Sequence, residues 1–126
     1  MNEWIAILGQ PVYSKKNSKV VTKDKRVLSS KRVREYEKKM LPVYEEKRDE
    51  WKRQYDKAEK PVSIEFYLIR PTKSKFDVLN MLQLPLDMMQ TAEWIPDDDV
   101  YTVNPIFTGW EINKDKSKCG FKCRIK

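Results

Sequence analysis

Acidic and amide side chains at helical spacing, between residues 75 and 99, are the part of this chain best suited to chemistry. Asp77, Asn80 and Asp87 fall on one side of a helix, because successive helical residues are about 100° apart. Pro96 stops any continued helix. Directly after it come three more carboxylates, Asp97, Asp98 and Asp99. We therefore expect two groups of carboxylates within reach of each other.

Carboxylates that converge in this way repel one another unless a cation lies among them. Ligand sets made only of oxygen favour hard divalent ions such as Mg²⁺. The alternative is purely structural: Asp77 caps a helix, Asp87 is a solvated helix residue, and residues 97–99 form a polar turn before a strand. The spacing alone leaves both interpretations open.

The opposite side of the same helix is apolar, which a helix needs in order to pack on a sheet while its acidic side faces away. We expect the helix to span residues 77–91, and Trp94 and Ile95 to pack the following segment against the core. The apolar positions are Val78, Leu82, Leu86 and Met89.

These motifs, in this order, resemble the RusA-type Holliday junction resolvases, a family of endodeoxyribonucleases common in phages and prophages. The resemblance rests on the FDxxN pattern at 76–80, the LD at 86–87 and the W-I-x-D-D-D run at 94–99. The N-terminal Gly9-Gln10-Pro11, followed by Lys15, Lys16 and Asn17, also resembles the opening of that family. It implies a catalytic site formed by Asp77, Asp98 and Asn80. It further implies Mg²⁺, with Mn²⁺ as a substitute, held by Asp77, Asp98, Asp87 and Asp97.

Two positions depart from the pattern of the family. Leu79 stands where the family has a second aspartate, and Gln83 stands where a lysine is usual. The departures imply weaker metal binding, a ligand recruited from elsewhere, or loss of cleavage. Glu65 is a candidate for the recruited carboxylate; alternatively it is an ordinary exposed strand residue.

The resemblance implies an endonuclease that resolves four-way DNA junctions by paired nicks, in recombination and repair. Because such a junction has two-fold symmetry and one chain carries one carboxylate cluster, we expect a homodimer. Met81, Leu84 and Met88 are candidates for the dimer interface or for the core. The alternatives are a DNA-binding protein that has lost cleavage, and a nuclease for flaps or RNA.

Composition supports a polyanionic partner. The 126-residue chain carries a net charge of +7, and basic surfaces bind nucleic acid by releasing counterions. It contains no histidine, which excludes Ser-His-Asp hydrolases and histidine-dependent metal nucleases but not carboxylate and metal chemistry. No apolar run is long enough for a membrane span, and the first residues are too acidic for a signal peptide. We expect a cytoplasmic protein of a bacterial or phage-infected cell.

Basic residues cluster on both sides of the first β-prone pieces. We expect a hairpin over residues 20–28 whose basic side chains bind phosphates. The alternative is that this region is a set of solvated loops. The candidate DNA-binding residues are Lys15, Lys16, Lys19, Lys23, Lys25, Arg26, Lys73 and Lys75.

The periodicities predict one α+β domain over residues 1–126, with a small mixed β-sheet on which a long N-terminal helical region and the Asp-bearing helix pack. A first strand covers residues 4–8. The helical region runs from Ser29-Ser30 to Lys60, kinked or split at Pro42. Its expected apolar stripe consists of Val33, Tyr36, Met40, Val43, Tyr44, Trp51 and Tyr55. Strands follow at 62–70 and 100–107, and 110–113 pairs with 119–125 as a final hairpin. Cys119 and Cys123 are expected on one face of that last strand, too far apart for a disulfide and therefore reduced.

Overall fold

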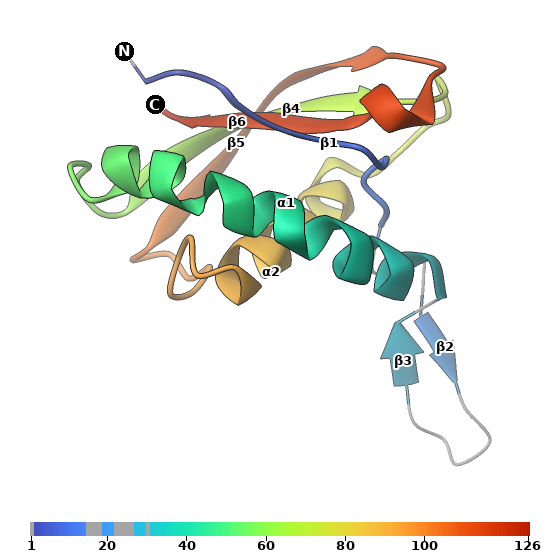
Figure 1. Cartoon of the computed structure of the whole chain (residues 1–126), viewed down its shortest axis with the longest axis horizontal. Helices are drawn as coiled ribbons and strands as arrows, with labels where there is room; N and C mark the ends of the chain where they lie inside the picture. The colour runs from blue at the N-terminus through green and yellow to red at the C-terminus, as the bar shows by residue number, and fades with distance from the viewer. Residues whose placement is uncertain (1, 15–18, 22–26, 30) are drawn as a thin grey trace.

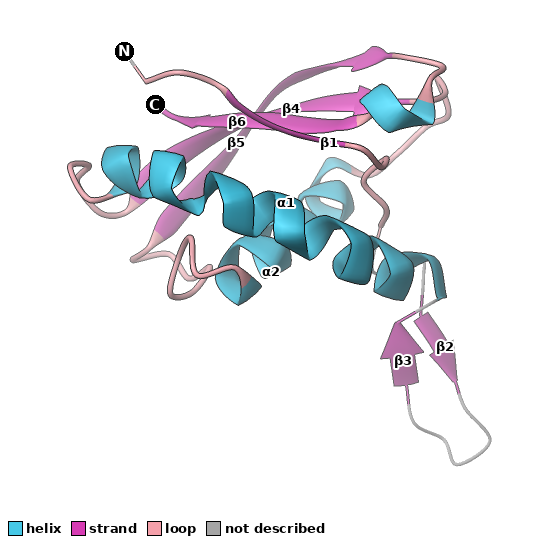
Figure 2. Ribbon diagram, viewed as in Figure 1, coloured by secondary structure: helices cyan, strands magenta, loops and turns pink. Residues whose placement is uncertain are grey.

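The computed structural model describes residues 2–14, 19–21, 27–29 and 31–126 (Figure 1). Its architecture is α+β, as predicted: a mixed four-stranded sheet with two long helices packed against it (Figure 2). The elements in chain order are β1 (Ile5–Leu8), β2 (Lys19–Val21), β3 (Val27–Ser29), α1 (Lys31–Tyr55), β4 (Val62–Arg70), α2 (Val78–Thr91), β5 (Val103–Ile112), the short 3-10 helix η2 (Lys116–Lys118) and β6 (Gly120–Ile125).

The strand order of the main sheet is β1-β6-β4-β5, which differs from the predicted pairing. β6 lies antiparallel to both β1 and β4, whereas β5 lies parallel to β4 on its other side. The predicted final hairpin is therefore wrong, because β4 separates the two segments that were expected to pair. β5 is one continuous strand through Pro105, which an edge strand tolerates because it has an unpaired side.

α1 is a single helix of 25 residues, so of the two predicted effects of Pro42, a kink or a split, the split does not occur. Pro42 is exposed, and it removes one backbone donor from the helix. Buried aromatic residues on both sides of it offset that loss, among them Tyr36 and Tyr44, whose hydroxyls are 2.8 Å apart. The buried stripe agrees with the predicted one except at Val43, which is half-buried.

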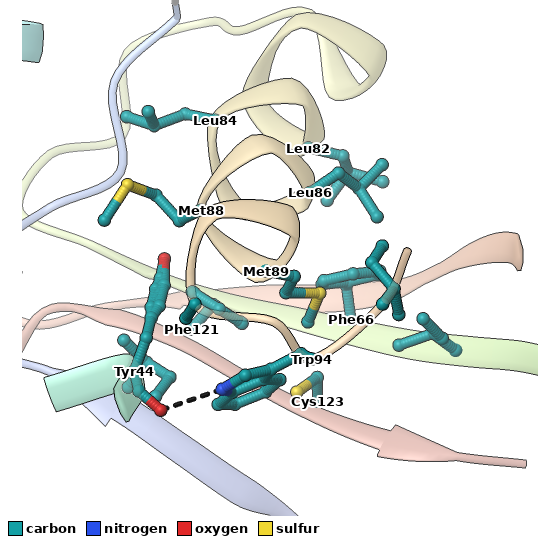
Figure 3. Close-up of a cluster of buried hydrophobic side chains, with 14 of the residues drawn as sticks. Tyr44, Phe66, Leu82, Leu84, Leu86, Met88, Met89, Trp94, Phe121 and Cys123 are labelled. Carbon is teal, nitrogen blue, oxygen red and sulfur yellow. Dashed lines mark hydrogen bonds between the residues drawn. The ribbon is translucent and has the colours of Figure 1, made fainter. Parts of the chain in front are cut away.

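α2 is buried on two sides rather than one. Leu84 and Met88 point to one side of the helix, whereas Leu82 and Leu86 point to the other (Figure 3). Met81, Leu84 and Met88 are all buried, so these three candidates for a dimer interface are core residues instead.

The segment after α2 is anchored by Trp94, which is fully buried. Its indole N–H donates to the carbonyl of Tyr44 over 2.8 Å (Figure 3). Its own carbonyl accepts from the indole N–H of Trp51 over 2.9 Å. The two indoles are stacked, with ring centroids 5.1 Å apart. The predicted packing of Trp94 and Ile95 is confirmed, and it fixes where the aspartates that follow can lie.

β2 and β3 form the predicted hairpin, which projects from the body of the molecule beside the start of α1 (Figure 1). Lys19 is the first residue of β2. The other predicted DNA-binding residues of this arm lie outside the described residues: Lys15, Lys16, Lys23, Lys25 and Arg26.

Cys119 and Cys123 are both free and buried. Cys119 was predicted to lie in the last strand, but it caps η2 and its thiol donates to the carbonyl of Asn113 over 3.1 Å. Burial raises the pKa of the Cys123 thiol well above its usual range, which makes it unreactive. Neither helix in the described part of the chain has the length and apolar character needed to cross a membrane.

Candidate active site

Asp77 is the N-cap of α2. Its Oδ1 accepts hydrogen bonds from the backbone N–H groups of Leu79 and Asn80, over 3.0 and 3.3 Å. The capping role considered in the sequence analysis is therefore real, and the helix begins one residue later than predicted. Capping also holds the Asp77 carboxylate in a fixed orientation, next to the half-buried Asn80 in the first turn. We call Asp77 and Asn80 the cap group.

A second group forms where the chain returns after α2. The backbone N–H of Asp98 donates to Oδ1 of Asp97 over 2.7 Å, and the amide of Gln90 lies 3.5 Å from the same oxygen. Local burial raises the pKa of Asp98, and the hydrogen bond and charge of Asp97 and the charge of Asp87 raise it further. Asp87, Asp97 and Asp98 are therefore close enough to interact, and we call them the loop group.

Asp99 has a different environment from its two neighbours. Its Oδ1 accepts from the N–H of Tyr101 over 2.9 Å and from the hydroxyl of Thr102 over 3.0 Å. Its carbonyl accepts from the backbone N–H groups of Thr102 and Val103. Asp99 thus closes the turn that leads into β5, which is a structural role.

The two groups lie at different levels of α2. Asp87 is ten residues after Asp77, and at about 1.5 Å per residue this is about 15 Å along the helix axis. One chain therefore does not bring all the predicted carboxylates together as expected. Among the residues that the structure describes, no three Asp, Glu, Cys or His side chains are placed to hold one metal ion.

The loop group offers the type of ligand atom that hard divalent cations prefer. Its donors are all carboxylate oxygens. Local burial is the main cause of the raised pKa of Asp98, and the negative charges of Asp97 and Asp87, which a cation would offset, add to it. Mg²⁺ usually keeps several waters and binds proteins through one or two carboxylates plus the phosphates of the substrate. Such an ion does not require three protein ligands from a single chain.

Leu79 and Gln83 lie on the exposed side of α2. Leu79 is 76% exposed and is therefore not a core residue. One turn later Gln83 is exposed as well. Positions 79, 80, 83 and 87 fall within one stripe of the helix surface, because their helical angles differ by no more than about 100°. The two departures from the family pattern therefore lie on the same surface as Asn80 and Asp87.

Glu65 does not contribute to either group. Its Oε1 accepts from Nε of Arg124 over 3.1 Å, an ion pair across β4 and β6. Because Glu65 alternates with the buried Ile64 and Phe66, it lies on the sheet face away from the core. It is neither the recruited carboxylate nor a simply exposed residue.

Two arginines that no sequence motif indicates lie beside the cap group. Arg32, Arg70 and the predicted Lys75 line a cleft of about 250 Å³ together with Asp77. Lys73 is exposed in the same connection between β4 and α2. No sequence signal pairs Arg32 with Arg70, because they are 38 residues apart on α1 and β4.

Comparisons with known proteins give a family for the chain. A family model described as Endodeoxyribonuclease RusA matches residues 9–116. The matched span contains the cap group, the loop group and the arginine-lined cleft. A comparison with curated proteins finds no match.

Proposed function

The chain belongs to the RusA endodeoxyribonuclease family, and from this premise we propose that it is a magnesium-dependent endonuclease that resolves four-way DNA junctions by paired nicks. Its role would be in recombination and repair, in the cytoplasm of a bacterial or phage-infected cell. The observation that carries the proposal is the proximity of Asp87, Asp97 and Asp98, whose interactions add to the effect of local burial in raising the pKa of Asp98.

Each group has a distinct task in this proposal. Asp98, with Asp97 and Asp87, would hold the ion, which when bound polarises the scissile phosphate and lowers the pKa of water. Asp77 is fixed by its capping bonds and presents a carboxylate at the start of α2. Asn80 offers an amide that can both donate and accept a hydrogen bond to orient the DNA strand or a water molecule.

The direct test is incubation of a synthetic four-way junction with the protein, with and without Mg²⁺. We expect paired nicks only with the ion, and less cleavage of a flap and of a linear duplex. Preferred cleavage of the flap would identify the flap as the substrate. Binding without cleavage by any divalent ion would support the alternative, a DNA-binding protein that has lost catalysis.

A variant at Leu79 distinguishes a working metal site that has one carboxylate fewer than the family pattern from a site that no longer supports cleavage. Because Leu79 is exposed, Leu79→Asp places a carboxylate on the stripe of Asn80 and Asp87 without disturbing the core. We expect the Mg²⁺ concentration for half-maximal cleavage to fall roughly tenfold, the lower end of the effects seen for groups around a metal.

Leu79→Asn is the matched control, because asparagine has nearly the same shape as aspartate but carries no charge. It should leave the Mg²⁺ requirement unchanged. If Leu79→Asp and Leu79→Asn behave alike in folded protein, position 79 has no part in metal binding.

We expect the active species to be a homodimer, because a two-fold symmetric junction needs two equivalent sites. Because Met81, Leu84 and Met88 are buried, a contact surface near the site would use exposed apolar residues. Among the described residues, those next to the two groups in the chain are Leu79, Val100 and Tyr101. Light scattering at micromolar concentration should give twice the 15.1 kDa mass of the chain. A monomer with full resolvase activity would contradict this expectation.

A further inference from the structure

The cleft beside Asp77 continues into a second lobe, of about 300 Å³. Both lobes are lined by Val12, Tyr13, Arg32 and Arg70. The first lobe also contains Lys75 and Asp77, and the second contains Lys116 of η2. The walls thus come from the segment after β1, the start of α1, the end of β4 and the region before β6. We call the two lobes together the arginine cleft.

The arginine cleft carries excess positive charge. Four cationic side chains, of Arg32, Arg70, Lys75 and Lys116, face a single carboxylate, that of Asp77. Within the described part of the chain, none of these four forms an ion pair, whereas Arg48 and Arg124 are paired with Glu93 and Glu65. No described carboxylate other than Asp77 lies in the cleft to offset this charge, which favours an anionic ligand.

Arg70 is held in place by contacts that leave its charge uncompensated. Its Nη1 donates to the carbonyl of Ser74, and its guanidinium carbon lies 4.2 Å from the ring centroid of Phe76 and 5.8 Å from that of Trp110. Phe76 and Trp110 support each other edge to face, at 5.4 Å. Burial lowers the pKa of Arg70, as expected for a partly desolvated cation. An anion bound beside it would offset that desolvation.

Arg32 reaches the same cleft from α1. Its guanidinium carbon lies 4.9 Å from the ring centroid of Tyr13. Tyr13 in turn packs edge to face on the buried Tyr36, with centroids 6.3 Å apart. Stacking on a supported ring restricts the guanidinium while its N–H groups stay available at the edge.

We propose that Arg32 and Arg70 form a clamp for a phosphodiester of the DNA backbone, next to the cap group. Guanidinium groups bind phosphate oxygens through two parallel hydrogen bonds, so two of them can fix the position as well as the charge of a phosphate. Contacts of this kind set the register of a DNA strand without reading its sequence. The inference rests on the proposed function, since it takes DNA as the ligand, but it concerns strand binding and not cleavage.

The test measures binding of a four-way junction by fluorescence anisotropy in EDTA, over a series of salt concentrations. We expect Arg32→Gln to weaken binding roughly tenfold, because charged hydrogen bonds to phosphate are lost. The slope of log affinity against log salt should also fall by about one. Arg34→Gln is the matched control: it removes the same charge from an exposed residue two positions along α1, outside the cleft, and should change affinity and slope little.

Arg70→Lys tests the clamp in a second way. It keeps the charge but not the paired N–H groups, so affinity should fall while the salt slope stays near that of the parent. Thermal unfolding checks that each variant is folded. Because Arg32 is exposed, Arg32→Gln still tests the clamp if Arg70→Lys does not fold. Equal effects of Arg32→Gln and Arg34→Gln on binding would overturn the clamp. They would not affect the proposed function, which junction cleavage by the parent protein tests separately. A parent protein that binds no DNA would overturn both.

Discussion

Replacing Asp98 by asparagine should reduce junction cleavage by a factor of about 10² or more, because it removes a charged oxygen from the loop group. Junction affinity should stay unchanged or become slightly tighter, since a carboxylate also repels the phosphate. Cleavage is measured by the rate of product formation under single turnover, and affinity by anisotropy in EDTA. Affinity should fall steeply with salt in parent and variant alike, because basic residues supply the phosphate contacts.

Asp99→Asn is the control for this prediction. It changes the neighbouring residue in the same way, but the amide oxygen of asparagine can still accept the hydrogen bonds from Tyr101 and Thr102. The turn into β5 is preserved, and cleavage should remain close to that of the parent. Equal loss in Asp98→Asn and Asp99→Asn would defeat the assignment of Asp98.

The pKa of Asp98 provides a readout that does not depend on cleavage. Because its pKa is raised in the folded protein, the charged carboxylate lowers folding stability at neutral pH. Asp98→Asn should therefore unfold at an equal or higher temperature than the parent at pH 7. The difference should vanish as the pH falls through the pKa of folded Asp98. Mg²⁺ should raise the unfolding temperature of the parent more than that of the variant.

Asp77→Asn should also reduce cleavage by about 10² or more if Asp77 is a catalytic carboxylate. The structure makes this variant informative, because the asparagine oxygen can still accept from the N–H groups of Leu79 and Asn80. Folding stability should therefore change little. Asp77→Ala removes the cap as well and should lower the free energy of unfolding by about 1 kcal/mol. Cleavage that falls only in Asp77→Ala would show that Asp77 acts as a cap alone.

A mixture of the two inactive variants shows whether the cap and loop groups work within one chain. In a mixed dimer of Asp77→Asn and Asp98→Asn protein, sites built within each chain would both be defective. Sites built from the cap group of one protomer and the loop group of its partner would include one intact site. Nicking activity restored by mixing would therefore indicate shared sites, and absence of nicking would indicate that each chain forms its own.

The sequence by itself determined the local features of this protein. Alternating apolar residues identified β4, and the apolar stripe of α1 was predicted almost residue for residue. Turn and cap chemistry placed the start of α2 within one residue, at Asp77. The spacing of the acidic motifs was sufficient to indicate the family. All of these depend on residues close together in the chain, whose periodicity reflects a helix or strand directly.

Only the tertiary structure decided which distant segments meet. β4 lies between β5 and β6 in the sheet. Because α2 is covered on two sides, Leu84 is a core residue although it lies on the same side of the helix as Asn80 and Asp87. The separation of the cap group from the loop group follows from the path of the chain along α2. The pairing of Arg32 with Arg70 joins the start of one helix to the end of a strand. Such contacts depend on how complete elements pack, and periodicity within one element carries no information about its neighbours.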